Sequence, residues 1–126
     1  MLTHSKAILF AIATLTAGLV AAPELALAHA TLKSSSPAAN TKVPARMKTI
    51  HLVFTEAIGP DQSKFELDDS TGAAVLTTTG KGVCINTTCK LPVPALKAGT
   101  YTLKYHLLSA DDGHVIEGAF SFTVTD

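Results

Sequence analysis

Strict alternation of apolar and polar residues over Gly99–Leu108 constrains the fold of this chain more than any other feature. Tyr101, Leu103, Tyr105 and Leu107 occupy every second position, and the positions between them hold mostly polar residues such as threonine, lysine and histidine. Successive side chains of a β-strand point to opposite faces. The pattern therefore predicts a strand with one face buried in a core and the other face in water.

The same alternation recurs elsewhere and makes the whole domain β-structured. It is clear at 48–55, 63–67 and 118–124, and shorter strand candidates lie at 31–34, 74–77 and 84–91. Turn-forming residues separate these segments at Ser36-Pro37, Gly59-Pro60-Asp61, Asp69-Ser70-Thr71-Gly72, Thr79-Gly80-Lys81-Gly82 and Asp111-Asp112-Gly113. No segment beyond the first thirty residues has a helical period. About seven short strands predict a single all-β domain, an antiparallel sandwich or barrel.

The first 28 residues have a different character from the rest of the chain. Lys6 precedes an uncharged apolar run at 7–22, and small residues follow at 26–28 in an A-x-A pattern. The run is shorter than the roughly 20 residues that a transmembrane helix needs. A cationic start, an apolar middle and a small-residue ending are typical of a secretory signal peptide. We therefore expect cleavage after residue 28 and a mature domain over 29–126.

A second cleavage frame is open, because Ala28-His29-Ala30 also fits the A-x-A pattern and would make Thr31 the first residue.

The signal segment also explains the composition. The chain has a mean hydropathy of +0.32 and only 16% charged residues, values that a membrane protein could share. Its formal net charge of zero gives no basic surface, so the composition does not support nucleic-acid binding.

Cys84 and Cys89 are the only two cysteines. In an exported protein the default state of such a pair is a disulfide. The Asn and Thr residues between them suit a turn, so a bridge across a hairpin or loop is reasonable. The alternative is a thiolate metal site, for which two ligands alone make a weak case.

A candidate metal site joins the two ends of the mature chain. Asp112 and His114 flank Gly113, and in an extended segment their side chains point to the same side. Cleavage after Ala28 would leave His29 with a free α-amine and an imidazole that chelate one metal together. Two nitrogens from His29, one from His114 and an oxygen from Asp112 form an N3O set. Such a set is typical of Cu(II) or Ni(II), and Cu(II) has the higher affinity of the two.

These residues, taken with their surroundings, resemble the CopC family of periplasmic copper-binding proteins. The matching segments are His29-Ala30-x-Leu32, Ser34-Ser35-Ser36-Pro37-Ala38, Ile50-x-Leu52-x-Phe54-x-Glu56, Gly99-x-Tyr101-x-Leu103-x-Tyr105, Ser109-Ala110-Asp111-Asp112-Gly113-His114 and Gly118-x-Phe120-Ser121-Phe122. They cover nearly the whole mature chain.

The resemblance implies a Greek-key, Ig-like β-sandwich that binds Cu(II) in a histidine brace and serves copper homeostasis and resistance in the periplasm. It implies that His29, Asp112 and His114 are the copper ligands. Glu56 falls where many relatives place an acidic residue near the copper, so it is either an outer or weak ligand or an exposed carboxylate at a strand end. The resemblance also implies a monomer whose partner is an inner-membrane copper transporter of the CopD kind.

Two features depart from the family pattern. Beyond the signal segment the only methionine is Met47, so a methionine-rich Cu(I) site is not expected. The cysteine pair is the second departure.

We expect a non-catalytic carrier or sequestering protein. The alternatives are a copper oxidase or monooxygenase, and a sandwich interaction module that binds no metal.

Overall fold

The computed structural model describes residues 32–126, which form nine β-strands and no helix. Accordingly, this part of the chain has no helix long and apolar enough to cross a membrane. The strands are β1 (Leu32–Ser36), β2 (Lys42–Pro44), β3 (Thr49–Phe54), β4 (Ile58–Asp68), β5 (Ala74–Thr79), β6 (Cys84–Ile85), β7 (Thr88–Pro92), β8 (Gly99–Ser109) and β9 (Val115–Thr125).

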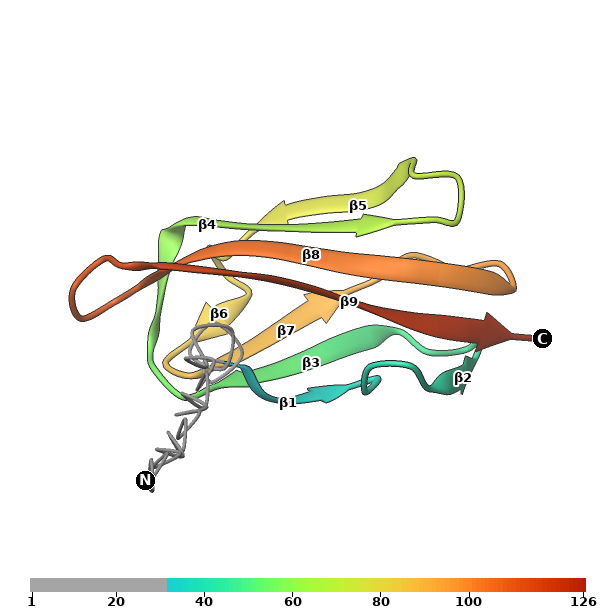
Figure 1. Cartoon of the computed structure of the whole chain (residues 1–126), viewed down its shortest axis with the longest axis horizontal. Coiled ribbons are helices and arrows are strands. Elements are labelled where there is room, and N and C mark those ends of the chain that lie inside the picture. The colour runs from blue at the N-terminus through green and yellow to red at the C-terminus, as the bar shows by residue number, and fades with distance from the viewer. Residues whose placement is uncertain (1–31) are drawn as a thin grey trace, which may run out of the picture.

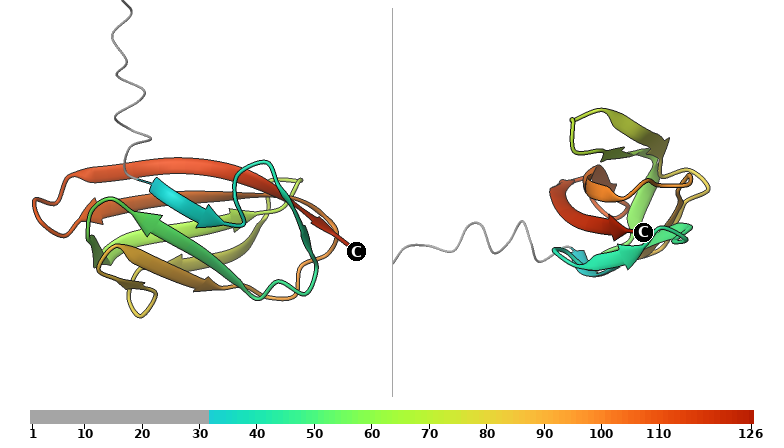
Figure 2. Two further views of the ribbon diagram at one scale, coloured as in Figure 1. Left: turned by 90° about the horizontal axis from the view of Figure 1, so that it is seen from below. Right: turned by 90° about the vertical axis from the view of Figure 1, so that its right-hand side faces the viewer.

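The strands form two sheets that pack face to face (Figures 1 and 2). One sheet has the order β1-β3-β7-β6 and the other has the order β2-β9-β8-β4-β5. All pairs are antiparallel except β2 with β9. Neighbours such as β3 and β7, or β4 and β8, are distant in sequence, as in Greek-key sandwiches. The predicted all-β sandwich is confirmed, with nine strands in place of about seven.

The core lies between the sheets and is built by the predicted alternation. Tyr101, Leu103, Tyr105 and Leu107 of β8 are all buried, and Leu103 and Leu107 have no exposed surface. Phe54 of the opposite sheet packs edge-on against Tyr105, with 5.6 Å between ring centroids. Burying a large apolar side chain contributes about 1.5–3 kcal/mol. The buried side chains of β3, β4, β7, β8 and β9 therefore hold the two sheets together.

Strand β4 begins earlier than the sequence predicts, and it runs through the expected turn at Gly59-Pro60-Asp61. Ser63 explains this difference. Its buried hydroxyl donates to the carbonyl oxygen of Gly59 at 2.5 Å and accepts the N–H of Leu108 at 3.3 Å. The side chain thereby replaces ladder bonds that the irregular segment lacks, so the proline does not end the strand.

The segment 84–91 is a hairpin and not one strand. Cys84 pairs with Cys89 and Ile85 pairs with Thr88, so a tight connection at residues 86–87 separates β6 from β7. A disulfide links Cys84 to Cys89, and the described residues contain no free cysteine. The predicted disulfide is confirmed, and the alternative of a thiolate metal site at this pair is wrong.

Candidate metal centre

Three connections gather at one end of the sandwich, on the left in Figure 1: β3–β4, the β6–β7 turn and β8–β9. The backbone N–H of Ala110 in the β8–β9 connection donates to the carbonyl oxygen of Ala57 in the β3–β4 connection at 2.8 Å. This bond ties together two loops whose sequences lie more than fifty residues apart. Both loops carry residues of the candidate site.

The β8–β9 connection is a tight turn that the sequence Asp112-Gly113-His114 explains. Gly113 has a φ of 70°, a conformation that glycine adopts without steric cost. Its N–H donates to the carbonyl oxygen of Ser109, and the N–H of His114 donates to Oδ1 of Asp112 at 3.1 Å. An aspartate that accepts the N–H two residues later is a common turn-forming arrangement.

The same carboxylate holds the imidazole of His114. Oδ1 of Asp112 lies 2.5 Å from Nδ1 of His114, so the structure brings these two predicted site residues together. Hydrogen bonds from the backbone and the side chain of His114 lower the pKa of the Asp112 carboxyl. The hydrogen bond to Asp112 in turn raises the pKa of His114, against the opposing effect of desolvation. The carboxylate of Asp112 and the ring of His114 therefore face each other within one turn.

Glu56, in the β3–β4 connection, faces the other side of the same ring. Its Oε2 lies 3.3 Å from Nε2 of His114, and its negative charge also helps to raise the pKa of His114. The side chains of Glu56 and His114 are 36% and 42% exposed, so solvent reaches both. The imidazole thus stands between two carboxylates, and the strand-end glutamate is part of the cluster.

The donor types in this cluster fit a divalent transition metal, because imidazole and carboxylate both bind Cu(II), Ni(II) and Zn(II). Within residues 32–126, however, no group of three or more His, Cys, Asp or Glu side chains is arranged to hold a metal ion. The remaining predicted ligand, His29, lies outside the described residues.

The other two histidines of residues 32–126 lie on the outer faces of the sheets. His51 is exposed on β3. His106 on β8 pairs with Glu117 of β9, its Nδ1 lying 2.5 Å from Oε1. The sequence did not single out Glu117, because only the register of β8 and β9 places it opposite His106. Neither histidine contacts Asp112 or His114.

Asp68 directly precedes the predicted turn at Asp69-Ser70-Thr71-Gly72 and has a different role. Only Asp69 belongs to the turn, where its carboxylate accepts the N–H groups of Thr71 and Ala73. Asp68 ends β4, is buried, and lies 2.6 Å from Nζ of Lys104. This ion pair stabilises the outer face of the five-stranded sheet and lies outside the candidate site.

Comparison with known proteins finds a family, similar sequences and similar structures that each match most of this chain. The CopC domain family matches residues 32–125. Protein YobA of Escherichia coli K12 is 33% identical over 127 residues, covering 98% of this chain and 99% of YobA. The crystal structure of CopC from Methylosinus trichosporium OB3b has a TM-score of 0.65 at 33% identity, covering 75% of this chain and 91% of that chain.

The structure of PcoC, a methionine-rich copper resistance protein from Escherichia coli, is also similar. Its TM-score is 0.57 at 26% identity, and the alignment covers 75% of this chain and 97% of PcoC. The family match spans well over half of the chain and includes Glu56, Asp112 and His114. This chain therefore belongs to the CopC domain family.

Proposed function

We propose that this protein is a periplasmic Cu(II)-binding protein of copper homeostasis and resistance, acting as a carrier or sequestering protein and not as an enzyme. The single observation that carries the proposal is the imidazole of His114 held between the carboxylates of Asp112 and Glu56. Family membership supports it, since PcoC, a similar protein, is a copper resistance protein.

In the proposed site the metal takes the α-amine and ring nitrogen of His29, a ring nitrogen of His114 and an oxygen of Asp112. This N3O set matches the ligand preference of Cu(II), which also has the highest affinity among the divalent first-row metals. The α-amine becomes available only if a signal peptide over residues 1–28 is cleaved. Its ordinary pKa of about 7.7–8.0 allows a metal to displace its proton near neutral pH.

The pairing of β1 supports this ligand set. Leu32, the first residue of β1, pairs with Phe54, the last residue of β3, and Glu56 follows two residues later. Three residues of extended chain span roughly 10 Å. A chain that begins at His29 is therefore long enough for its amine to reach the connection that carries Glu56.

The carboxylates support a binding role over a catalytic one. Asp112 and Glu56 both face the imidazole of His114, so each is placed to offset the charge of a bound Cu²⁺ ion. Ligands that fill the coordination positions leave less room for a substrate or an oxidant.

We propose a monomer that exchanges copper with an inner-membrane transporter of the CopD kind.

The proposal is tested by Cu(II) titration of the mature protein, with its His29 N-terminus verified by mass and its spectrum recorded by EPR. We expect one tight site with an N3O-type signal. His114→Ala should weaken binding by about 100-fold or more, since it removes a direct ligand. His51→Ala, an exposed histidine on β3, is the matched control and should leave binding unchanged. Equal losses in both variants would refute the site assignment.

A further inference from the structure

We propose that the disulfide-closed β6–β7 hairpin positions Glu56 at the metal centre, so that the Cys84–Cys89 disulfide sets part of the copper affinity. The copper half of this inference rests on the proposed function. The positioning half rests only on contacts among described residues, and it can be tested without copper.

Two hydrogen bonds from the hairpin turn hold the segment that carries Glu56. The N–H of Phe54 donates to the carbonyl oxygen of Thr87 at 2.8 Å, and the N–H of Ile58 donates to the carbonyl oxygen of Asn86 at 2.9 Å. These donors lie two residues before and two residues after Glu56. The hairpin turn therefore fixes both ends of the short segment from which the glutamate side chain projects.

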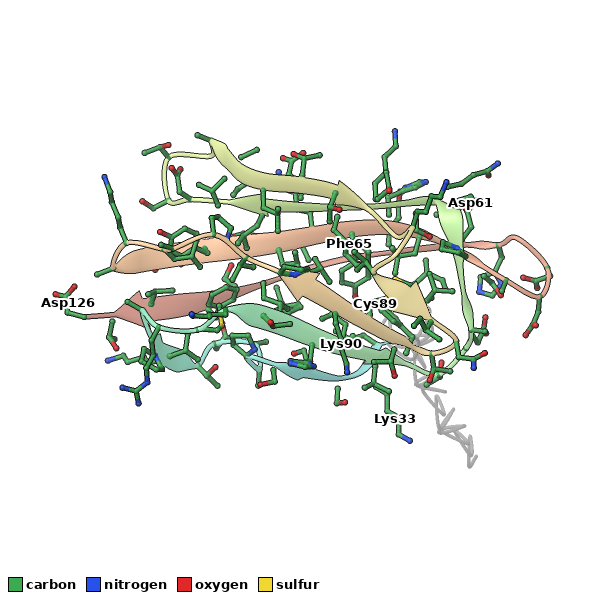
Figure 3. All side chains as sticks on the ribbon, turned by 180° about the vertical axis from the view of Figure 1, so that it is seen from behind. Lys33, Asp61, Phe65, Cys89, Lys90 and Asp126 are labelled. Carbon is green, nitrogen blue, oxygen red and sulfur yellow. A yellow bond between two sulfur atoms is a disulfide. The ribbon has the colours of Figure 1, made fainter. Side chains whose placement is uncertain are left out.

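The first strand of the hairpin is short and has a single strand neighbour, although the N–H of Cys84 also donates to the carbonyl oxygen of Gly80 at 2.8 Å. β6 has only two residues, lies at the edge of the four-stranded sheet, and pairs with β7 alone. β7 is firmly held, because Cys89 pairs with Leu52 of β3 and both side chains are fully buried. The disulfide thus links this short edge strand to a residue in the centre of the sheet (Figure 3 labels Cys89).

A short loop limits what this disulfide does for global stability. The cysteines are five positions apart in the sequence, and a cross-link that closes a shorter loop removes less chain entropy from the unfolded state. Its larger effect is expected to be local, on the turn carbonyls of Asn86 and Thr87. Without the bridge, the β3–β4 segment keeps its bond from Ala110 to Ala57 but loses the fixed partner on its other side.

The consequence reaches the imidazole of His114. Glu56 lies 3.3 Å from Nε2 of His114 only while its segment is held in place. Groups that orient or neutralise a ligand change metal affinity by roughly 10–100-fold when they are lost. Cys84 and Cys89 are therefore positioning residues that act through Glu56, and neither touches the metal.

The test compares four forms of the mature protein: wild type, Cys84→Ala/Cys89→Ala, Glu56→Gln and the triple variant. Substitutions replace chemical reduction because free thiols bind copper themselves. We expect Cu(II) affinity to fall about tenfold in Glu56→Gln and by a similar factor in the cysteine variant. The triple variant should bind no more weakly than Glu56→Gln alone, because both changes remove one interaction.

A matched control separates positioning from general loss of stability. Val124→Ala shortens a buried side chain near the C-terminal end of β9, the end of the strand that is far from Asp112. It should leave copper affinity unchanged. Full additivity of the two losses in the triple variant, or an equal loss in Val124→Ala, overturns the inference.

Amide hydrogen exchange provides a readout that needs no metal. In the cysteine variant the amides of Phe54 and Ile58 should exchange at least about tenfold faster, while Leu103 in the centre of β8 keeps its protection. Unchanged exchange at Phe54 and Ile58 overturns the positioning role. If exchange at Phe54 and Ile58 is faster in the cysteine variant but the wild type binds no copper, the positioning role is supported and the proposed function is refuted.

Discussion

At the scale of single residues, Asp112 combines a structural and a chemical role in one oxygen atom. Its Oδ1 accepts the backbone N–H of His114, which shapes the turn, and also contacts the imidazole, which orients the ring. Asparagine forms the same turn because its side-chain oxygen accepts the same bond. Replacement of the carboxylate by an amide therefore separates the two roles.

We predict that Asp112→Asn folds with unchanged stability and loses roughly 10–100-fold in Cu(II) affinity, because the amide keeps the turn but removes the negative charge. Thermal unfolding and Cu(II) titration measure the two effects. Asp111→Asn is the matched control, since Asp111 is the adjacent exposed carboxylate in the same turn. A comparable loss of affinity in both variants would show that only the net charge of the turn matters.

At the scale of strands, Asp68 of β4 and Lys104 of β8 form a cross-strand ion pair whose contribution depends on pH. The hydrogen bond from Lys104 lowers the pKa of the Asp68 carboxyl, and the same contact raises the pKa of Lys104. A carboxyl with a lowered folded-state pKa contributes stability above its unfolded value of about 3.9 and loses it at lower pH. A lysine with a raised folded-state pKa contributes stability below its unfolded value of about 10.4, and this stability is lost at higher pH.

We therefore predict that Lys104→Met is less stable than the wild type between about pH 4 and pH 10, and that this difference shrinks at either extreme. Urea unfolding at pH 3, 7 and 11 measures the difference. Lys64→Met, on the same outer face of the sheet, is the control and should show no such pH dependence. A difference that stays constant from pH 7 to pH 3 would contradict the assignment of Asp68 as its source.

The strands also show which parts of the structure the sequence could predict. Alternation identified β8 to within one residue at its end and found most of β9, because one face of each is buried. It missed β2, whose three residues are too few to show a period. The sequence predicted that Asp112 and His114 lie together, but as neighbours in an extended segment; the structure brings them together in the turn between β8 and β9. The support of Glu56 by the hairpin was not predictable, because it comes from backbone carbonyls, which have no sequence signature.

At the scale of the whole molecule, the proposed site depends on how the fold brings distant segments to one end. β1 pairs with β3, and the connection after β3 is bonded to the connection after β8 (Figure 2). The fully buried core residues of the described part of the chain run from Ile50 to Val124. The described core and the proposed ligand His29 therefore come from different segments of the chain.

This separation leads to a prediction about where the mature chain begins. Protein starting at His29 and protein starting at Thr31 should unfold at the same temperature, because both contain all nine described strands. Only the form starting at His29 should bind Cu(II) tightly, and the other should lose more than the roughly 10–100-fold that loss of an outer partner costs. Acetylation of the His29 amine, which leaves the imidazole intact, should give an intermediate affinity. Mass measurement of the exported protein identifies the natural form. Equal affinity of the two forms would mean that Asp112, His114 and Glu56 bind the metal without the N-terminus.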